Sequence, residues 1–393
     1  MPKKNEGAAP IKISRRGADR ISRGHAWVYR SDVSANNVPP GALVSVLDDR
    51  GRNLGSAFYS SSSQIALRML SPTPVTDLSR LVRERTEAAI AYRKSVVSDS
   101  NAYRVIFSES DFLPGLIVDL YNDLLVVQIL TQAMDAEPVR QTIVSALIDK
   151  VGPAGIIERV EPRIRELEQL SPKTSGLIYG QKSTTEFQMN GVRFHFDALE
   201  GQKTGAFLDQ RENYAAAAQY ARGEALDVFC YQGGFALHLA ERCSNVTGVD
   251  SSRPALEIAD QNAALNGRDI EWIEANAFDL LKDFASTGRQ YDTIVLDPPA
   301  FAKNKQNLPT ALRGYKELNL RAMKMLRPGG ALVSCSCSYH VSQADFLEML
   351  ASAAADARRH FRLVESRGQA KDHPILLTLP ETAYLKCFIS TLS

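Results

Sequence analysis

The sequence lacks several features that would assign it at once to a class of protein. No apolar run approaches the roughly 20 residues that a membrane-spanning helix requires, so we expect no membrane span. The first residues, MPKKNEGAAPIK, contain no apolar segment of the kind found in secretory signals, and we expect a cytoplasmic protein. The net charge is only +1 over 393 residues, which argues against nucleic-acid binding over the whole surface.

Cysteine is also scarce, and its pattern argues against a disulfide framework. The odd number and irregular spacing of the cysteines favour free thiols in a reducing compartment. Two of them lie one residue apart in ALVSCSCSYHVS (331–342). A zinc site formed by Cys335, Cys337 and His340 would lack a nearby fourth ligand and the usual C-x₂₋₄-C spacing. A disulfide between cysteines one residue apart is sterically poor, so we predict neither a metal nor a disulfide here. The five cysteines are Cys230, Cys243, Cys335, Cys337 and Cys387.

The positive charge that the chain does carry is concentrated at its N-terminal end. Within the first thirty residues, only Glu6 and Asp19 oppose the basic side chains. Such a cluster is compatible with contacts to backbone phosphates of a nucleic acid, although a solvated tail has the same composition. The basic residues are Lys3, Lys4, Lys12, Arg15, Arg16, Arg20, Arg23 and Arg30.

The periodicity of the chain predicts three domains. Residues 1–75 alternate short period-2 runs such as ALVSVLD with turn signals, which indicates a small all-β domain. Residues 76–190 open with an amphipathic helix, for which Thr76 or Asp77 is the expected N-cap. Strand-like runs and a hairpin that turns at Asn190 and Gly191 follow, which indicates an α+β domain.

Residues 191–393 alternate strands with helices. Short apolar runs separated by helical stretches predict parallel strands buried on both faces, and therefore a doubly wound α/β domain. Two further strands, near 375–379 and 384–391, are expected to add an antiparallel pair at the end of the sheet. The five runs assigned to parallel strands are ALDVFC, NVTGVD, IEWIEA, YDTIVLD and ALVSCS.

The loops after these strands predict a ligand site, because such sheets bind ligands beyond the carboxyl ends of their strands. Gly233 and Gly234 follow the first strand and allow close approach of the backbone to a ligand, although a plain turn would also use them. Asp250 ends the second strand, where its carboxylate could accept hydrogen bonds from a ribose diol. The dinucleotide fingerprint G-x-G-x-x-G is absent, which counts against NAD or FAD. Together with EANAF and LDPPAF after the next two strands, the pattern fits S-adenosylmethionine.

In these motifs the chain resembles the class I S-adenosylmethionine-dependent methyltransferases, and closely the bacterial 23S ribosomal RNA large subunit methyltransferase I family, which makes 5-methylcytidine. The resemblance runs nearly from end to end and implies a PUA RNA-binding domain at the N-terminus. The matching stretches are GHAWVYRSDV, SESDFLPGLIVDLYNDLLVVQ, EGQKTGAFLDQREN, DVFCYQGGFALHLA, VTGVDSS, LDPPAFAKNK, SCS and KDHPILLTLPETAYLKCF.

The resemblance also implies a set of cofactor-binding residues for S-adenosylmethionine. Asn276 occupies a position where the family usually has an aspartate that meets the adenine amino group, and its amide oxygen could accept the same hydrogen bond. The implied set is Asp227, Phe229, Tyr231, Gly233, Gly234, Phe235, Asp250, Ser251, Asn276, Ala277 and Asp297.

Cys337 is the predicted catalytic nucleophile. Carbon 5 of cytosine reacts with an electrophilic methyl group only after a thiolate has added to carbon 6. Cys337 lies at the carboxyl end of ALVSCS and matches the S/T-C-S element of the family, with Tyr339 in place of the usual glycine. Cys335 is expected on the strand as a buried thiol and stays the alternative nucleophile. Asp297 is expected near the base, where it either binds the cytosine amino group or assists proton transfer. The alternative is a purely structural role as a helix or loop cap before Pro298.

The predicted RNA contacts lie in loops near the same end of the sheet. Lys203, Arg211, Lys303 and Lys305 are candidates for phosphate contacts, although each is equally explained as a solvated charge. Phe301 is a candidate for stacking on a flipped base. The expected partner is 23S ribosomal RNA or a precursor of the large ribosomal subunit, and a homodimer is a family-level expectation. Two alternatives stay open: an exocyclic-amine (guanine N2) methyltransferase, and a non-catalytic RNA-binding assembly factor.

Overall fold

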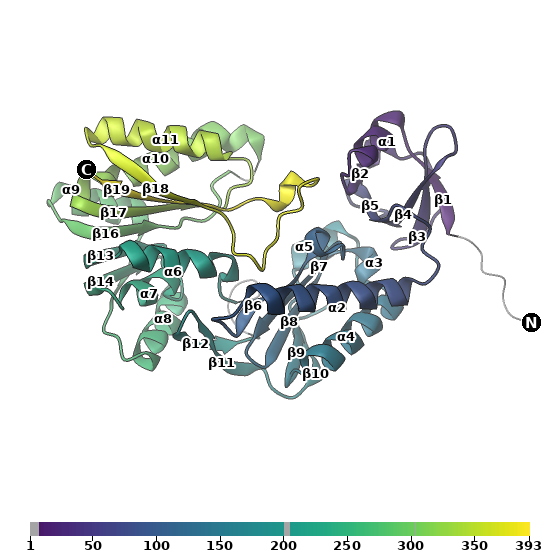
Figure 1. Ribbon diagram of the computed structural model, residues 1–393, viewed down its shortest axis with the longest axis horizontal. Helices are drawn as coiled ribbons and strands as arrows, with labels where there is room; N and C mark the ends of the chain where they lie inside the picture. Colours follow the sequence, from purple (N-terminus) through teal and green to yellow (C-terminus); the bar gives the residue numbers. More distant parts are fainter. Residues whose placement is uncertain (1–7, 200–204, 303) are drawn as a thin grey trace, which may run out of the picture. The chain divides into compact units, whose positions relative to one another are not determined.

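The computed structural model describes residues 8–199, 205–302 and 304–393, so Lys203 and Lys303 lie outside the described residues (Figure 1). Contacts divide the chain into two compact units. Unit 1 comprises Met1–Thr185, Phe196–Gly205 and Lys371–Thr382, and unit 2 comprises Glu186–His195, Ala206–Ala370 and Ala383–Ser393. Residues 371–382, here called the crossing segment, therefore leave unit 2 late in the chain and pack with unit 1. The domain limits at 75 and 190 stay a prediction.

The N-terminal part of unit 1 is a small β domain, as the period-2 pattern predicts. Its sheet has the strand order β1-β3-β4-β5-β2. Inward side chains such as Val44, Val46 and Leu67 are fully buried in one apolar cluster. The helix α1 was not predicted, and its N-terminus is capped by Ser14, whose side chain accepts from the N–H of Gly17. The elements are β1 Ala9–Lys12, α1 Arg15–Ser22, β2 Trp27–Tyr29, β3 Leu43–Leu47, β4 Asn53–Tyr59 and β5 Ile65–Ser71.

The rest of unit 1 is an α+β fold around a second five-stranded sheet, with the order β10-β9-β8-β7-β6. Asp77 rather than Thr76 caps the long first helix, because its carboxylate accepts from the N–H of Arg80. The hairpin of β11 and β12 turns at Asn190 and Gly191, both at positive φ, and carries the chain into unit 2 and back. The elements are α2 Leu78–Val96, β6 Ala102–Phe107, β7 Leu116–Tyr121, β8 Leu124–Ile129, α3 Gln132–Asp135, α4 Glu137–Val151, β9 Gly155–Glu158, α5 Pro162–Leu167, β10 Gly176–Gly180, β11 Thr184–Met189 and β12 Val192–Asp197.

The crossing segment is held in unit 1 by buried polar contacts. The carboxylate of Asp372 accepts from the backbone N–H of Arg104 at 2.8 Å, and the guanidinium of Arg93 donates to the carbonyl of Asp372 at 2.9 Å. The neighbouring His373 is buried against the ring of Phe107. The prediction of a strand near 375–379 is wrong. Residues 375–379 instead form local turns between Pro374 and Pro380. The strand that joins the sheet of unit 2 in its place is β18, Phe361–Arg367.

Unit 2 is a doubly wound α/β domain with the strand order β15-β14-β13-β16-β17-β19-β18. The five predicted parallel strands are confirmed, and β19 pairs antiparallel with both β17 and β18. The strand order reverses between β13 and β16, the place where such sheets bind ligands. The strands are β13 Gly223–Val228, β14 Cys243–Asp250, β15 Glu271–Glu274, β16 Tyr291–Leu296, β17 Leu326–Ser336, β18 Phe361–Arg367 and β19 Lys386–Leu392.

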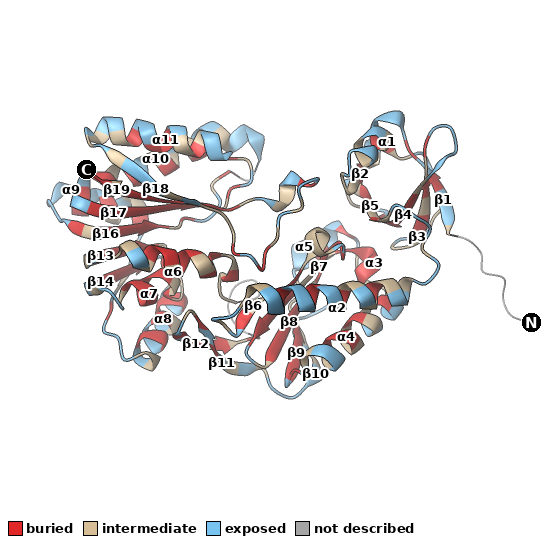
Figure 2. Cartoon of the chain, viewed as in Figure 1, coloured by how far each residue is buried: buried red, intermediate tan, exposed pale blue. Residues whose placement is uncertain are grey.

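Helices cover both faces of this sheet. Figure 1 shows α10 and α11 over one face and α6, α7 and α8 over the other, and Figure 2 shows the central strands buried between these layers. One apolar cluster joins the strands to α9, α10 and α11. Within the described part of the chain, no helix is both long and apolar enough to span a membrane. The helices are α6 Arg211–Tyr220, α7 Gly234–Leu239, α8 Arg253–Leu265, α9 Ala277–Ser286, α10 Leu308–Met325 and α11 Gln343–Ala357.

Candidate cofactor and catalytic site

The loop after β13 has a backbone that only certain residues tolerate. Phe229 and Tyr231 adopt positive φ angles of 67° and 50°, and Gly233 has φ 85°. A side chain on Gly234 would place its Cβ 2.6 Å from the ring of Tyr214, so glycine is required there by close packing. Strained non-glycine residues cost of order 1–3 kcal/mol each and cluster at functional sites. The strain therefore supports a ligand-binding role for this loop over a plain turn.

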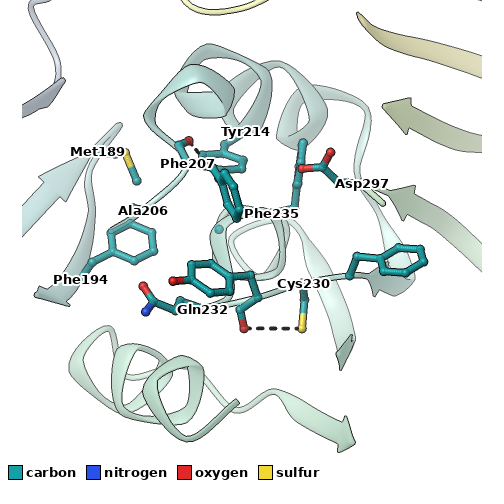
Figure 3. Close-up of a pocket in the computed structure, with 12 residues that line it drawn as sticks. Met189, Phe194, Ala206, Phe207, Tyr214, Cys230, Gln232, Phe235 and Asp297 are labelled. Atoms are coloured by element: carbon teal, nitrogen blue, oxygen red, sulfur yellow. Dashed lines mark hydrogen bonds between the residues drawn. The ribbon is translucent and has the colours of Figure 1, made fainter. Parts of the chain in front are cut away.

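A pocket lies beside this loop (Figure 3). Its walls come from the β11–β12 hairpin, the segment before α6, the β13 loop and the end of β16. The rings of Phe207 and Tyr231 meet edge to face at 5.1 Å. An apolar wall with few polar groups is typical of a small-molecule site. The lining residues are Met189, Phe194, Ala206, Phe207, Tyr214, Phe229, Cys230, Tyr231, Gln232, Gly234, Phe235 and Asp297.

Asp227 is a fully buried carboxyl group at the end of β13, with 0% of its surface exposed. Its Oδ2 accepts from the N–H of Ala236 at 2.8 Å, whereas its Oδ1 has no hydrogen-bond partner among the described residues. Burial, helped by the negative charges of Asp297 and Asp250 and opposed by the hydrogen bond from Ala236, raises the pKa of Asp227 to about 8. An unfilled acceptor close to other carboxylates favours a cationic ligand near the loop after β13.

Asp250 fixes the loop to the end of β14. Its Oδ2 accepts from the N–H of Tyr231 at 3.0 Å, and its Oδ1 accepts from the N–H of Ser252 at 2.9 Å. Each carboxylate oxygen has more than one lone-pair site, so both can also accept from a ribose diol. Ser251 is exposed beside it.

Asn276 acts as the N-cap of α9. Its amide oxygen accepts from the N–H of Phe278 at 2.9 Å and, less closely, from the N–H of Asp279 at 3.4 Å. The side chain is exposed and Ala277 behind it is buried. A contact from Asn276 to adenine stays a prediction, and its oxygen would have to share that contact with the cap.

The two neighbouring cysteines differ in accessibility. Cys335 is buried on β17 opposite Cys387 of β19, and burial raises the pKa of its thiol well above the ordinary value. Cys337 follows the end of β17, is half-buried, and lies with its Sγ 3.9 Å from the carbonyl oxygen of Pro298. None of the five cysteines, all of which the structure describes, is in a disulfide. Of this pair, Cys337 is the thiol that lies at the carboxyl ends of the strands and is partly open.

A hydroxyl cluster holds the loop that carries Cys337. The hydroxyl of Tyr315 lies 3.0 Å from Ser336 Oγ and 2.9 Å from Ser338 Oγ. Ser338 Oγ also accepts from the N–H of Ala302 at 3.2 Å, which ties the loop to the segment after the Asp-Pro-Pro turn. These interactions place the thiol beside the end of β16. Sequence reasoning assigned no role to Tyr315.

Lys386 is a second residue that sequence reasoning missed. It begins β19 with only 8% of its surface exposed, and its Nζ donates to the carbonyls of Ser338 at 2.6 Å and Tyr384 at 2.8 Å. A lysine inside the apolar run YLKCFIS was the signal in the sequence, because lysine is almost never buried without partners.

Asp297 lines the pocket at the point where the strand order reverses. Its N–H bonds to the carbonyl of Val228, and its Oδ2 accepts from the amide of Gln210 at 3.0 Å. The amide oxygen of Gln210 in turn accepts from Asn213 at 2.6 Å. The next helical turn starts only at Lys305, so Asp297 is not a helix cap.

Two of the predicted RNA-contacting residues are less exposed than expected, because Arg211 is buried and Phe301 is half-buried. Arg211 begins α6 with 2% of its surface exposed, so its burial does not fit a phosphate contact at an open rim. Phe301 packs its ring 4.7 Å from Tyr315 and 6.0 Å from Phe278 and joins the apolar core, so it does not fit a free stacking platform.

Four arginines of the N-terminal basic cluster line a hollow of about 660 Å³ on unit 1. The buried carboxylate of Asp32 accepts from Arg16 at 2.8 Å and from Arg20 at 3.3 Å. These bonds fix the guanidinium groups of both arginines at the hollow. The guanidinium of Arg20 also lies 4.6 Å from the ring centre of Tyr29. The residues around the hollow are Arg15, Arg16, Asp19, Arg20, Arg23, His25 and Thr378. Within the ranges that the structure describes, no group of three or more His, Cys, Asp or Glu residues could hold a metal ion.

Comparison with known families assigns two regions of the chain to protein families. Residues 174–377 match the model of S-adenosylmethionine-dependent methyltransferases, and residues 11–72 match that of PUA-like domains. A ribosomal RNA large subunit methyltransferase I from Shewanella denitrificans is 37% identical, over 98% of this chain and 99% of its own. The protein of the same name from Tolumonas auensis is 39% identical, over 93% of this chain and 95% of its own.

Solved structures agree on the fold. A Streptococcus mutans protein assigned as an S-adenosylmethionine-dependent methyltransferase superimposes with a TM-score of 0.82 at 19% identity, over 98% of this chain and 100% of its own. A crystal structure of a methyltransferase complexed with SAH gives a TM-score of 0.84 at the same identity and coverage.

Proposed function

Because the chain belongs to the ribosomal RNA large subunit methyltransferase I family, we propose that it transfers a methyl group from S-adenosylmethionine to carbon 5 of a cytidine in 23S ribosomal RNA. The observation that carries the cytosine assignment is the half-buried thiol of Cys337, which is in no disulfide and lies beside the turn after β16. A methyltransferase that acts on an exocyclic amine needs no thiol at this place.

The residues around the pocket fit S-adenosylmethionine, which supplies an electrophilic methyl group when bound. The open acceptor of Asp227 and the two neighbouring carboxylates, Asp250 and Asp297, suit a ligand that carries positive charge. Asp250 would accept from the ribose hydroxyls, and the rings of Phe207 and Tyr231 would exclude water from the reacting atoms. These cofactor contacts are part of the proposal.

Cys337 is proposed to start the reaction. Its thiolate forms a bond from Sγ to carbon 6 of the cytosine, and the π electrons of the C5–C6 bond move to carbon 5. Carbon 5 takes the methyl group while the methyl–sulfur bond breaks toward sulfur. A base then removes the proton on carbon 5, the C5–C6 double bond re-forms, and the thiolate leaves. Asp297, which lines the pocket and bonds to Gln210, is proposed either to bind the cytosine amino group or to take part in the proton transfer.

The PUA-like part, residues 1–75, is proposed to hold the RNA, and residues 76–190 to link it to the catalytic domain. The fixed guanidinium groups of Arg16 and Arg20 support this role, because phosphate contacts supply most of the affinity for RNA. A homodimer stays a prediction.

A comparison of two cysteine variants tests the mechanism. Large-subunit RNA from cells that lack the gene would be incubated with Cys337→Ala or Cys335→Ala and with S-adenosylmethionine, digested, and analysed for 5-methylcytidine by mass spectrometry. We expect Cys337→Ala to form no product, while Cys335→Ala, which removes a buried thiol, keeps most of the activity. N2-methylguanosine formed by both variants would support the exocyclic-amine alternative. Failure of the wild-type protein to bind S-adenosylmethionine would support a non-catalytic assembly factor.

A further inference from the structure

We propose that Lys386 is a positioning residue that stabilises the thiolate form of Cys337 and so sets the pH range in which the nucleophile is active. The inference rests on the proposed role of Cys337 as nucleophile. It assigns a function to a buried lysine that the cofactor pocket does not use.

The position of Lys386 follows from the pairing of the last strand. Ser336 of β17 lies opposite Lys386 of β19, so the lysine lies level with the end of the strand that leads into Cys337. Its ammonium donates to the carbonyl of Ser338, the residue directly after the cysteine. The second bond, to the carbonyl of Tyr384, fixes the side chain from its own strand. The ammonium is therefore held against the backbone of the nucleophile loop from two sides.

These two bonds do not neutralise the positive charge of Lys386. An ammonium group has three N–H donors, and two of them are directed to neutral carbonyls. Because the group is almost fully buried, its charge is costly without an anion. Burial lowers the pKa of Lys386 to about 8, and interaction with Cys337 opposes that shift. The group that favours the charged lysine is thus the cysteine, and by the reciprocity of charge interactions the charged lysine favours the thiolate.

Three other polar groups near Cys337 in the described part of the chain do not replace this cation. Tyr315 on α10 interacts electrostatically with the thiol, but its own hydroxyl is bound to Ser336 and Ser338. Asp297 precedes the proline whose carbonyl meets the thiol, and its negative charge would oppose a thiolate. The imidazole of His340 is nearby in the chain, but its ring packs against Tyr339.

The proposed reaction requires the thiolate form of Cys337 that the lysine would stabilise. A thiolate must be present before the addition to carbon 6 and must be a good leaving group at the end. The positive charge of Lys386 stabilises the thiolate of Cys337 both when it attacks carbon 6 and when it leaves. It also keeps part of the cysteine reactive at pH 7, where an ordinary cysteine is only a few per cent ionised.

The test is the pH dependence of alkylation of Cys337. Iodoacetamide labelling would be followed between pH 6 and 10 by peptide mass spectrometry, in a Cys243→Ser background that removes the other partly exposed thiol. Lys386→Met removes the charge, and Lys386→Gln also removes it while keeping a donor for the two carbonyls. Lys316→Met is the matched control, because this lysine pairs with Asp356 on the outer helices at 2.7 Å.

We expect the midpoint of the alkylation profile to rise by at least about one pH unit in both Lys386 variants and to stay in place in Lys316→Met, with labelling at pH 7 slowed about tenfold. Methyl transfer at pH 7 should fall by a similar factor and recover above pH 9, with the KM for S-adenosylmethionine unchanged. An unchanged midpoint in the folded Lys386→Gln protein would overturn the inference.

The alkylation profile does not depend on the identity of the RNA product, so the two proposals can fail separately. A shifted midpoint together with 5-methylcytidine formation by Cys337→Ala would refute the cysteine mechanism and leave the Lys386–Cys337 interaction intact. Loss of 5-methylcytidine in Cys337→Ala with an unshifted midpoint would refute only the role of Lys386.

Discussion

Cofactor binding should release a proton from Asp227. In the free protein the pKa of this carboxyl group is about 8, so about nine in ten groups hold a proton at pH 7. A positive charge about 5 Å away contributes about 3 kcal/mol at an effective dielectric constant of about 20, which lowers a pKa by about two units. The bound protein would then carry an ionised Asp227 at pH 7. The expected release at pH 7 is about 0.8 proton for each cofactor bound.

The sign of the pH dependence follows from this release. The unbound carboxyl group holds its proton below about pH 8 and the bound one does not, so a higher pH favours binding. The affinity for S-adenosylmethionine should increase about fivefold between pH 7 and pH 8 and level off above that. The same raised pKa means that ionisation of Asp227 destabilises the free fold as the pH rises from about 4 to 8. The unliganded protein should therefore gain thermal stability at pH 8 in an Asp227→Asn variant.

Calorimetric titrations at pH 7 in buffers with different ionisation enthalpies measure the released protons directly. Asp227→Asn should show a slope near zero and bind the cofactor about 10- to 100-fold more weakly, because a charged hydrogen-bonding group is worth about 1.5–3 kcal/mol. Lys386→Met serves as a control, since Lys386 also has a pKa of about 8 and could contribute protons. A wild-type slope of zero, or proton uptake, would refute the reasoning about Asp227.

Three further predictions concern packing and anchoring. Gly234→Ala places a methyl group 2.6 Å from the Tyr214 ring, so it should lower cofactor affinity at least tenfold and reduce the melting temperature, as calorimetry and thermal unfolding would show; unchanged values would contradict the close packing. Tyr315→Phe removes the hydroxyl that joins Ser338 to its neighbours and should cost about 1–2 kcal/mol of unfolding free energy in urea titrations, with kcat reduced more than KM. Asp372→Ala removes the buried carboxylate of the crossing segment and should make that segment sensitive to limited proteolysis; continued resistance would show that its other contacts suffice.

The five parallel strands of unit 2 could be predicted from the sequence, because each is a short apolar run between helical stretches. The end of the chain was not readable in the same way. ILLTL has the composition of a strand, but the carboxylate and carbonyl of Asp372 bond to Arg104 and Arg93, residues far away in the sequence. Such long-range partners leave no local periodicity. The residues of β18, FRLVESR, have no clean alternation because the strand is exposed at the edge of the sheet.

The candidate site shows the same division. The motifs predicted which loops come together, because loops after parallel strands share one edge of the sheet. They did not predict which side chains would be covered. Arg211 and Phe301 carry the charge and the ring expected of RNA contacts, but tertiary packing buries the first and pairs the second with Tyr315. Lys386 was overlooked because its place beside the nucleophile loop depends on the pairing of β19 with β17. That pairing joins residues about 50 positions apart and cannot be read from the sequence around Lys386.

The crossing segment also determines how this protein can be dissected. Arg367 and Cys387 face each other in neighbouring strands, so the residues between β18 and β19 are in effect a long insertion at a hairpin end. A catalytic fragment cut out at residue 186 would keep that insertion after removing its partners, and would expose Asp372 and Leu379, which are buried in the whole chain. Exchange of the insertion for a turn of two to five residues should yield an independently folding methyltransferase core, and a simple N-terminal deletion should not.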